Sequence, residues 1–160
     1  MTKEYTIISI ILFIGVLGLI YIFYPNRIVN ANKLEIGNTD FGKLYIDTKS
    51  IETVKKDDVY YLVVNAEEYY TDKKFLNELH KNENLKNAIG ATYLYMFSSD
   101  GKYYCVPQSY LFDKEEKICL NLGSDLNLKT IDKDILVSVY SKSLDVLSEQ
   151  KRLYNMFKLK

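Results

Sequence analysis

An uncharged apolar run, Thr6 to Tyr24, constrains the architecture of this chain more than any other sequence feature. The run reads TIISIILFIGVLGLIYIFY, and Pro25 follows it directly. As a helix it would rise about 28 Å, close to the roughly 30 Å hydrocarbon thickness of a bilayer, and Pro25 would end it. The sequence therefore predicts a single N-terminal transmembrane helix within residues 1–25 that contacts membrane lipid through residues 6–24.

A cleaved signal peptide is the alternative interpretation of this segment. Val29 and Ala31 have the small-residue spacing that signal peptidase accepts, so cleavage after Ala31 stays open. The apolar run is longer than the usual signal-peptide core of about 7–15 residues, which favours an uncleaved anchor. We expect the segment to be retained.

The flanking charges and the cysteines point to different sides of the membrane. Lys3 precedes the run, whereas Arg27, Lys33 and Lys43 follow it, and this count favours a cytoplasmic domain. A long following domain can be translocated despite nearby charge, and a cysteine pair suits an oxidising compartment. We expect an extracytoplasmic domain, in the periplasm or on the cell surface.

A polar connector at residues 26–40 leads into a soluble domain at residues 41–160. Patterns typical of strands occur at residues 43–47, 50–54, 59–66, 91–98, 102–110 and 117–122. Helical spacing occurs at residues 72–89 and 143–158, the second as the end of one long helix or after a strand. The expected fold is α+β: an antiparallel meander sheet of about five or six strands with helices packed on one face.

Turn residues separate several of these segments. Asp100-Gly101 readily forms a type I′ hairpin turn, because both residues tolerate positive φ. A second turn is expected at residues 113–116, and residues 55–58 make a charged turn. Pro107 indicates an edge strand or a bulge.

Charge and motif content argue against several classes of function. Lys plus Arg and Asp plus Glu number 21 each, so no net positive charge recruits nucleic acid. His80 is the only histidine and lies in a different predicted element from the cysteines, which argues against a zinc site and a catalytic triad. The side chains of Glu67 and Glu68 diverge on extended backbone. We predict no enzyme activity, no metal site and no cofactor.

Cys105 and Cys119 are the only cysteines and fall in predicted strands joined by one turn. A disulfide bond forms if the register brings their Cα atoms within about 7 Å. The alternative is two buried thiols in a reducing compartment.

Tyrosine is abundant, with 15 Tyr and no Trp. Amphipathic rings of this kind suit half-buried sheets and contact surfaces. Helices can cover only one face of the sheet, so the other face is a candidate surface for a protein partner, and cross-strand packing is the alternative. The candidate partner-binding residues are Tyr60, Tyr61, Tyr93, Tyr95, Tyr103 and Tyr104.

The segment GKLYIDTKSI at residues 42–51, a long aromatic strand, YYCVPQSYLFD at residues 103–113 and a closing helix resemble the surface-adhesin protein E family. The resemblance spans about residues 42–150. It implies a small sheet-and-helix domain exported to the bacterial envelope, where some members bind host matrix proteins or plasminogen. This chain departs from the family in its anchor-like head and in Tyr104, where an acidic residue often precedes the cysteine.

These features together predict a membrane-anchored envelope protein whose extracytoplasmic domain binds a protein or envelope component without catalysis. A structural subunit of a membrane-embedded complex for secretion, division or phage lysis is the first alternative. A small hydrolase is the second. The oligomeric state stays open.

Overall fold

The computed structural model describes residues 32–56 and 58–158, with side chains as far as Arg152. The predicted transmembrane helix, its lipid contacts and the alternative cleavage after Ala31 lie outside the described residues. Within the described ranges, no helix combines the length and the hydropathy that a membrane crossing requires.

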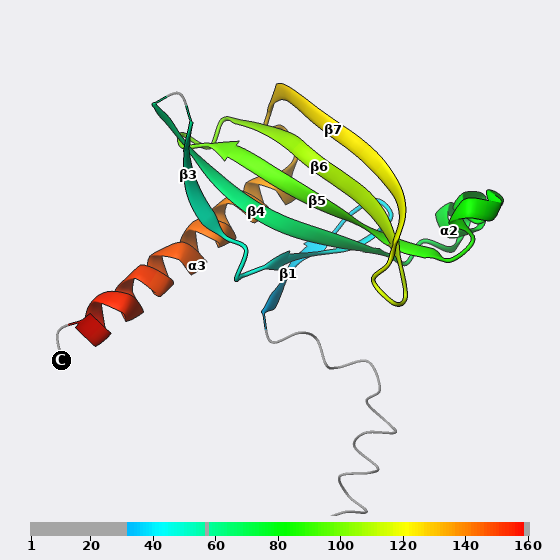
Figure 1. Ribbon diagram of the computed structural model, residues 1–160, viewed down its shortest axis with the longest axis horizontal. Coiled ribbons are helices and arrows are strands. Elements are labelled where there is room, and N and C mark those ends of the chain that lie inside the picture. Colours follow the sequence, from blue (N-terminus) through cyan, green and yellow to red (C-terminus); the bar gives the residue numbers. More distant parts are fainter. Residues whose placement is uncertain (1–31, 57, 159–160) are drawn as a thin grey trace, which may run out of the picture. The chain divides into compact units, whose positions relative to one another are not determined.

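Strands account for most of the described structure (Figure 1). They are β1 Lys33–Asn38, β2 Gly42–Asp47, β3 Glu52–Lys56, β4 Val59–Tyr70, β5 Ala88–Ser98, β6 Tyr103–Asp113 and β7 Ile118–Thr130. The helical segments are α2 Lys73–Leu79, the 3-10 turn η1 Glu83–Leu85, and α3 Asp134–Lys158.

The strands form one antiparallel sheet in the order β1-β2-β4-β5-β6-β7, with β3 also paired to β4. Along one edge of β4, the C-terminal half pairs with β2 and the N-terminal half with β3, so that Ala66 faces Ile46 and Val63 faces Glu52. The other edge of β4 pairs with β5. The prediction that residues 59–66 form a central strand is therefore confirmed.

Side chains of alternate residues separate the sheet into two faces. Leu62, Val64 and Ala66 of β4 belong to the main core, which includes Leu136 and Val139 of α3. We call this side the helix face and the opposite side the open face. Figure 1 shows α3 passing behind the sheet on the helix face.

The long C-terminal helix confirms the first of the two predicted alternatives, because α3 is helical from Asp134 onward. Leu136, Val139, Ser143 and Leu147 follow helical spacing and face the core. The described side chains after Leu147 are exposed. The first half of α3 therefore provides the packing surface.

The expected α+β fold with helices packed on one face is wrong. The domain is mainly an antiparallel sheet of seven strands, and of its described helices only α3 covers a face. α2 lies at one end of the sheet and has no buried residue (Figure 1). Residues 33–38, expected within the polar connector, form β1.

The helix expected at residues 72–89 is also too long. Asp72 caps α2, its side chain accepting a hydrogen bond from the Phe75 N–H at 2.6 Å, but α2 ends at Leu79. Residues from Ala88 pair with β6, where Gly90 faces Phe112. A Cβ at Gly90 would lie 2.6 Å from Phe112 Cζ, so Gly90 permits close strand packing and does not end a helix.

The hairpin predicted at Asp100-Gly101 joins β5 to β6 and is confirmed, but its turn type is different. The Gly101 N–H donates to the Ser98 carbonyl at 2.9 Å, and Gly101 has φ +68°. Asp100 does not have positive φ, which a type I′ turn requires. The geometry is that of a type I turn followed by a left-handed glycine.

Candidate functional site

A cleft of about 810 Å³ opens on the helix face of the sheet. Its walls come from residues 38–41 between β1 and β2, from β4, β5 and β6, and from residues 133–136 at the start of α3. Tyr93 on its floor packs against the main core and against a second apolar cluster that contains Leu85 and Leu111. The cleft therefore lies where the two cores meet.

The carboxylate of Glu68 lines this cleft and is only 6% exposed. It accepts hydrogen bonds from the hydroxyl of Thr39 and from the hydroxyl of Tyr93, the latter at 3.1 Å. No ion pair in the described part of the chain includes Glu68. A buried carboxylate is costly without a positive partner, so neutral donors alone satisfy it incompletely.

Thr39 connects this carboxylate to the loop that forms one wall of the cleft. Its Oγ1 accepts hydrogen bonds from the N–H groups of Gly42, at 2.9 Å, and Phe41, at 3.2 Å, while its hydroxyl donates to Glu68. A Cβ at Gly42 would lie 1.9 Å from the Tyr69 carbonyl oxygen, so only glycine allows the loop to approach β4 this closely. The position of the wall is thus set by backbone contacts.

Aromatic rings form much of the remaining surface of the cleft. Tyr93 and Tyr95 stack with ring centroids 5.7 Å apart, and Tyr104 contacts Tyr95 edge-on at 6.1 Å. Phe41 and Phe75 stack at 4.3 Å. Burial raises the pKa of Tyr93 and of Tyr95 above the ordinary range, and Glu68 adds to both shifts. Both hydroxyls therefore stay protonated, and that of Tyr93 donates to Glu68.

The structure separates the six tyrosines predicted to bind a partner. Tyr93, Tyr95 and Tyr104 come together in the cleft. They lie on the helix face, whereas the sequence placed the contact surface on the uncovered face. Tyr60 and Tyr103 are exposed and Tyr61 is half-buried, and none of these three lines the cleft.

Sequence reasoning missed Glu68, Thr39 and the two phenylalanines at the cleft. A signal for Glu68 was present, since it continues the inward positions Leu62, Val64 and Ala66 along β4. This alternation predicts that the carboxylate of Glu68 faces the core. Thr39 and Phe75 carry no comparable local signal, because the chain fold brings their segments to the cleft.

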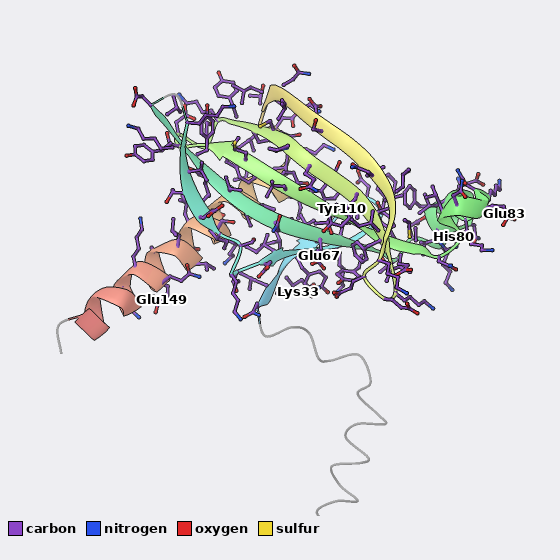
Figure 2. All side chains as sticks on the ribbon, viewed as in Figure 1. Lys33, Glu67, His80, Glu83, Tyr110 and Glu149 are labelled. Atoms are coloured by element: carbon purple, nitrogen blue, oxygen red, sulfur yellow. The ribbon has the colours of Figure 1, made fainter. Side chains whose placement is uncertain are left out.

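On the open face, Lys33 forms a satisfied polar cluster with Glu67 and Tyr69. Its Nζ lies 2.6 Å from Glu67 Oε2, 2.8 Å from the Tyr69 hydroxyl and 5.3 Å from the Tyr69 ring centroid. Figure 2 labels Lys33 on β1 and Glu67 on β4, and the Lys33 side chain reaches Glu67 across the intervening strand β2. Burial lowers the pKa of Lys33, but the hydrogen bonds with Glu67 and Tyr69 outweigh it and raise the pKa overall.

Residues considered for catalysis or metal binding have structural roles. His80 caps α2, and its Nε2 lies 2.8 Å from the Ala88 carbonyl oxygen. Ser98 bonds to Asp100 and to the backbone of Tyr103 across the hairpin turn. Among the residues with described positions, no group of three or more His, Cys, Asp or Glu side chains is arranged to hold a metal ion.

In the structure, Cys105 and Cys119 are free thiols and form no disulfide bond. The turn at residues 113–117 sets a register in which Leu120 faces Leu111, so Cys119 lies near that end of β6. Cys105 is six residues away along β6, roughly 20 Å at the usual rise of a strand. Pro107 falls at a bulge, as predicted, in the register shift between Leu94 and Met96 of β5.

β7 forms one edge of the sheet and carries a row of exposed aliphatic side chains. These are Ile118, Leu120, Leu122, Leu126 and Leu128. An edge strand with exposed apolar residues is a surface on which another chain can pair.

No protein-family model, curated protein or solved structure matches the chain.

Proposed function

We propose that this protein is a non-catalytic binding protein that is anchored in a membrane by residues 6–24 and holds a protein or envelope component in the cleft. The observation that carries the proposal is the buried Glu68 carboxylate in an aromatic cleft of about 810 Å³. Binding pockets typically have about 300–1,000 Å³, mostly apolar walls and a few convergent polar groups. The cleft has this volume and these convergent polar groups, and its walls combine aromatic and aliphatic side chains with polar ones.

The chemistry of the cleft favours binding over catalysis. Its lining contains Thr39 and Lys133 but no serine, cysteine or histidine. The Thr39 hydroxyl is already committed to two backbone N–H groups and to Glu68. The two N–H groups occupy both acceptor lone pairs of Oγ1, so this oxygen has no free lone pair with which to attack a substrate.

The location of the domain is part of the same proposal. The length and the lack of charge of residues 6–24 support a retained membrane anchor. The resemblance of residues 42–150 to the surface-adhesin protein E family supports a domain on the extracytoplasmic side. The cleft would then meet partners in the envelope.

Site-directed photo-crosslinking tests the proposal in membranes that contain the full chain. p-Benzoylphenylalanine at Phe41, which is 42% exposed at the cleft, should give a cross-linked partner. The matched control is Leu144 on α3, which is 40% exposed and does not line the cleft. No product at position 41 above that at position 144 would overturn the proposal.

A second candidate function, a structural subunit of a membrane complex, is favoured by the exposed edge strand β7. A third photo-crosslinker at Leu126, which is 67% exposed, tests it in the same membranes. Products from position 126 alone would favour the structural subunit, whereas products from position 41 alone would favour the cleft.

A further inference from the structure

We infer that the cleft binds a lysine side chain of a protein partner, with the Glu68 carboxylate as its counter-ion. This inference rests on the proposed function, in which the cleft is the binding site. It adds the chemical class of the group that enters.

The hydrogen bonds of Glu68 leave room for a cation. A carboxylate offers about four lone-pair positions on its two oxygens. Thr39 donates to Oε1 and Tyr93 donates to Oε2, so about half of the acceptor capacity remains. Both donors are neutral hydroxyls, and the negative charge of Glu68 has no positive partner in the described part of the chain.

The open face of the same strand shows how this chain satisfies such a carboxylate. There Glu67 and the Tyr69 hydroxyl hold the Lys33 ammonium, which also lies 5.3 Å from the centroid of the Tyr69 ring. The cleft repeats this combination with Glu68 and Tyr93, and with stacked aromatic rings beside them. In the cleft, no lysine of the described residues pairs with Glu68.

The walls of the cleft suit a long aliphatic side chain that ends in a charge. Aromatic rings contact the methylene groups of a lysine and attract its ammonium through their negative faces. Phe41 and Phe75 form a stacked pair in the lining, and Phe41 is exposed. The volume of the cleft accommodates the residues on either side of the lysine as well, so we assign the occupant to a peptide segment.

Among the described residues, Lys133 is the one lysine that lines the cleft, and it lies between Asp132 and Asp134 in the sequence. No ion pair within the described residues joins Lys133 to Glu68. Its ammonium is therefore not the counter-ion of Glu68 in the structure, and the carboxylate remains available to a lysine of a partner.

The test is an NMR titration of the full chain in detergent micelles, with labelled tyrosine and threonine. The probes are the peptides acetyl-Gly-Gly-Lys-Gly-Gly-amide and its norleucine counterpart, which has the same length without the ammonium. The lysine peptide should shift the signals of Tyr93 and Thr39 and bind about tenfold more tightly than the norleucine peptide. This comparison uses the unmodified chain and needs no variant to fold.

Two matched variants then test which carboxylate binds the ammonium of the lysine peptide. Glu68→Gln keeps the shape of the side chain and should weaken binding of the lysine peptide about tenfold, whereas Glu67→Gln on the open face should leave it unchanged. Equal binding of the two peptides, or an unaffected Glu68→Gln variant, would overturn the lysine assignment. The cross-links at position 41 test whether the cleft binds a partner, and the peptide titration tests whether a lysine enters it. Either proposal can therefore be overturned without the other. Absence of any shift at Tyr93 and Thr39 in the unmodified chain would also overturn the lysine assignment.

Discussion

Glu67 and Glu68 are neighbours in β4, yet their carboxylates lie on opposite faces of the sheet and have opposite surroundings. Glu67 is paired with the ammonium of Lys33, whereas Glu68 is bonded to the hydroxyls of Thr39 and Tyr93. The divergence follows from the two-residue period of a strand, as the sequence predicted. Because only Glu68 lines the cleft, the same substitution at Glu67 serves as a control for experiments on Glu68.

Thr39→Val should destabilise the domain by about 1–3 kcal/mol. The substitution keeps the β-branched shape but removes the acceptor for the Phe41 and Gly42 N–H groups and a donor to the buried Glu68. Urea denaturation followed by circular dichroism measures the change. Thr53→Val on the exposed strand β3 is the control and should change the free energy of unfolding by less than about 0.5 kcal/mol. Equal effects of the two substitutions would contradict the assigned role of Thr39.

Gly101→Asn should cost more stability than Gly123→Asn, although both glycines have positive φ, +68° and +91°. Asparagine tolerates left-handed backbone better than most residues. A Cβ at Gly101 would lie 2.6 Å from Tyr140 Cε1, while a Cβ at Gly123 would meet nothing within 4 Å. We expect a difference of about 1–3 kcal/mol in thermal or urea unfolding. A difference near zero would mean that the Tyr140 ring moves aside freely.

Ser143→Ala should stabilise the protein by about 1 kcal/mol. Ser143 is fully buried on α3, and its hydroxyl has no hydrogen-bond partner among the residues that the structure describes. Alanine removes the unsatisfied group and has the higher helix propensity. Ser141→Ala on the exposed side of the same helix loses a hydrogen bond to the Ser138 carbonyl that water can replace, and so should gain little beyond the propensity effect. The comparison of the two melting temperatures isolates the buried hydroxyl, and a loss of stability in Ser143→Ala would refute its assignment as unsatisfied.

Cys105 and Cys119 should both react with iodoacetamide without prior reduction, and reductant should leave the melting temperature unchanged. Burial raises the pKa of both thiols, with added effects of Asp125 on Cys105 and Asp113 on Cys119. Because the thiolate is the reactive form, a raised pKa makes alkylation slow at neutral pH and faster as the pH rises. Cys119 should react before Cys105, since it is less buried. Mass spectrometry of the two peptides over time gives both rates, and a linked peptide pair would contradict the register.

Local sequence patterns identified the elements that local chemistry controls. The alternation of residues 59–66, the turn residues Asp100-Gly101 and the helical spacing toward the C-terminus each predicted the correct element. These signals work because turn geometry and side-chain periodicity depend on residues close together in the chain. The turn at residues 113–116 also fixes which residues of β6 and β7 face each other. The resulting register separates Cys105 from Cys119.

The tertiary structure alone decided the extent of α2, the presence of β1 and the composition of the cleft. Residues 88–90 have enough helical spacing to extend a helix, but pairing with β6 satisfies their backbone and draws them into β5. Thr39, Glu68 and Tyr93 come from three separate segments, and no local pattern relates them. Sequence by itself thus determined the hairpins, the central strand and the closing helix. Only strand pairing across the sheet could bring a carboxylate, two hydroxyls and the aromatic rings into one cleft, because that pairing joins residues distant in the chain.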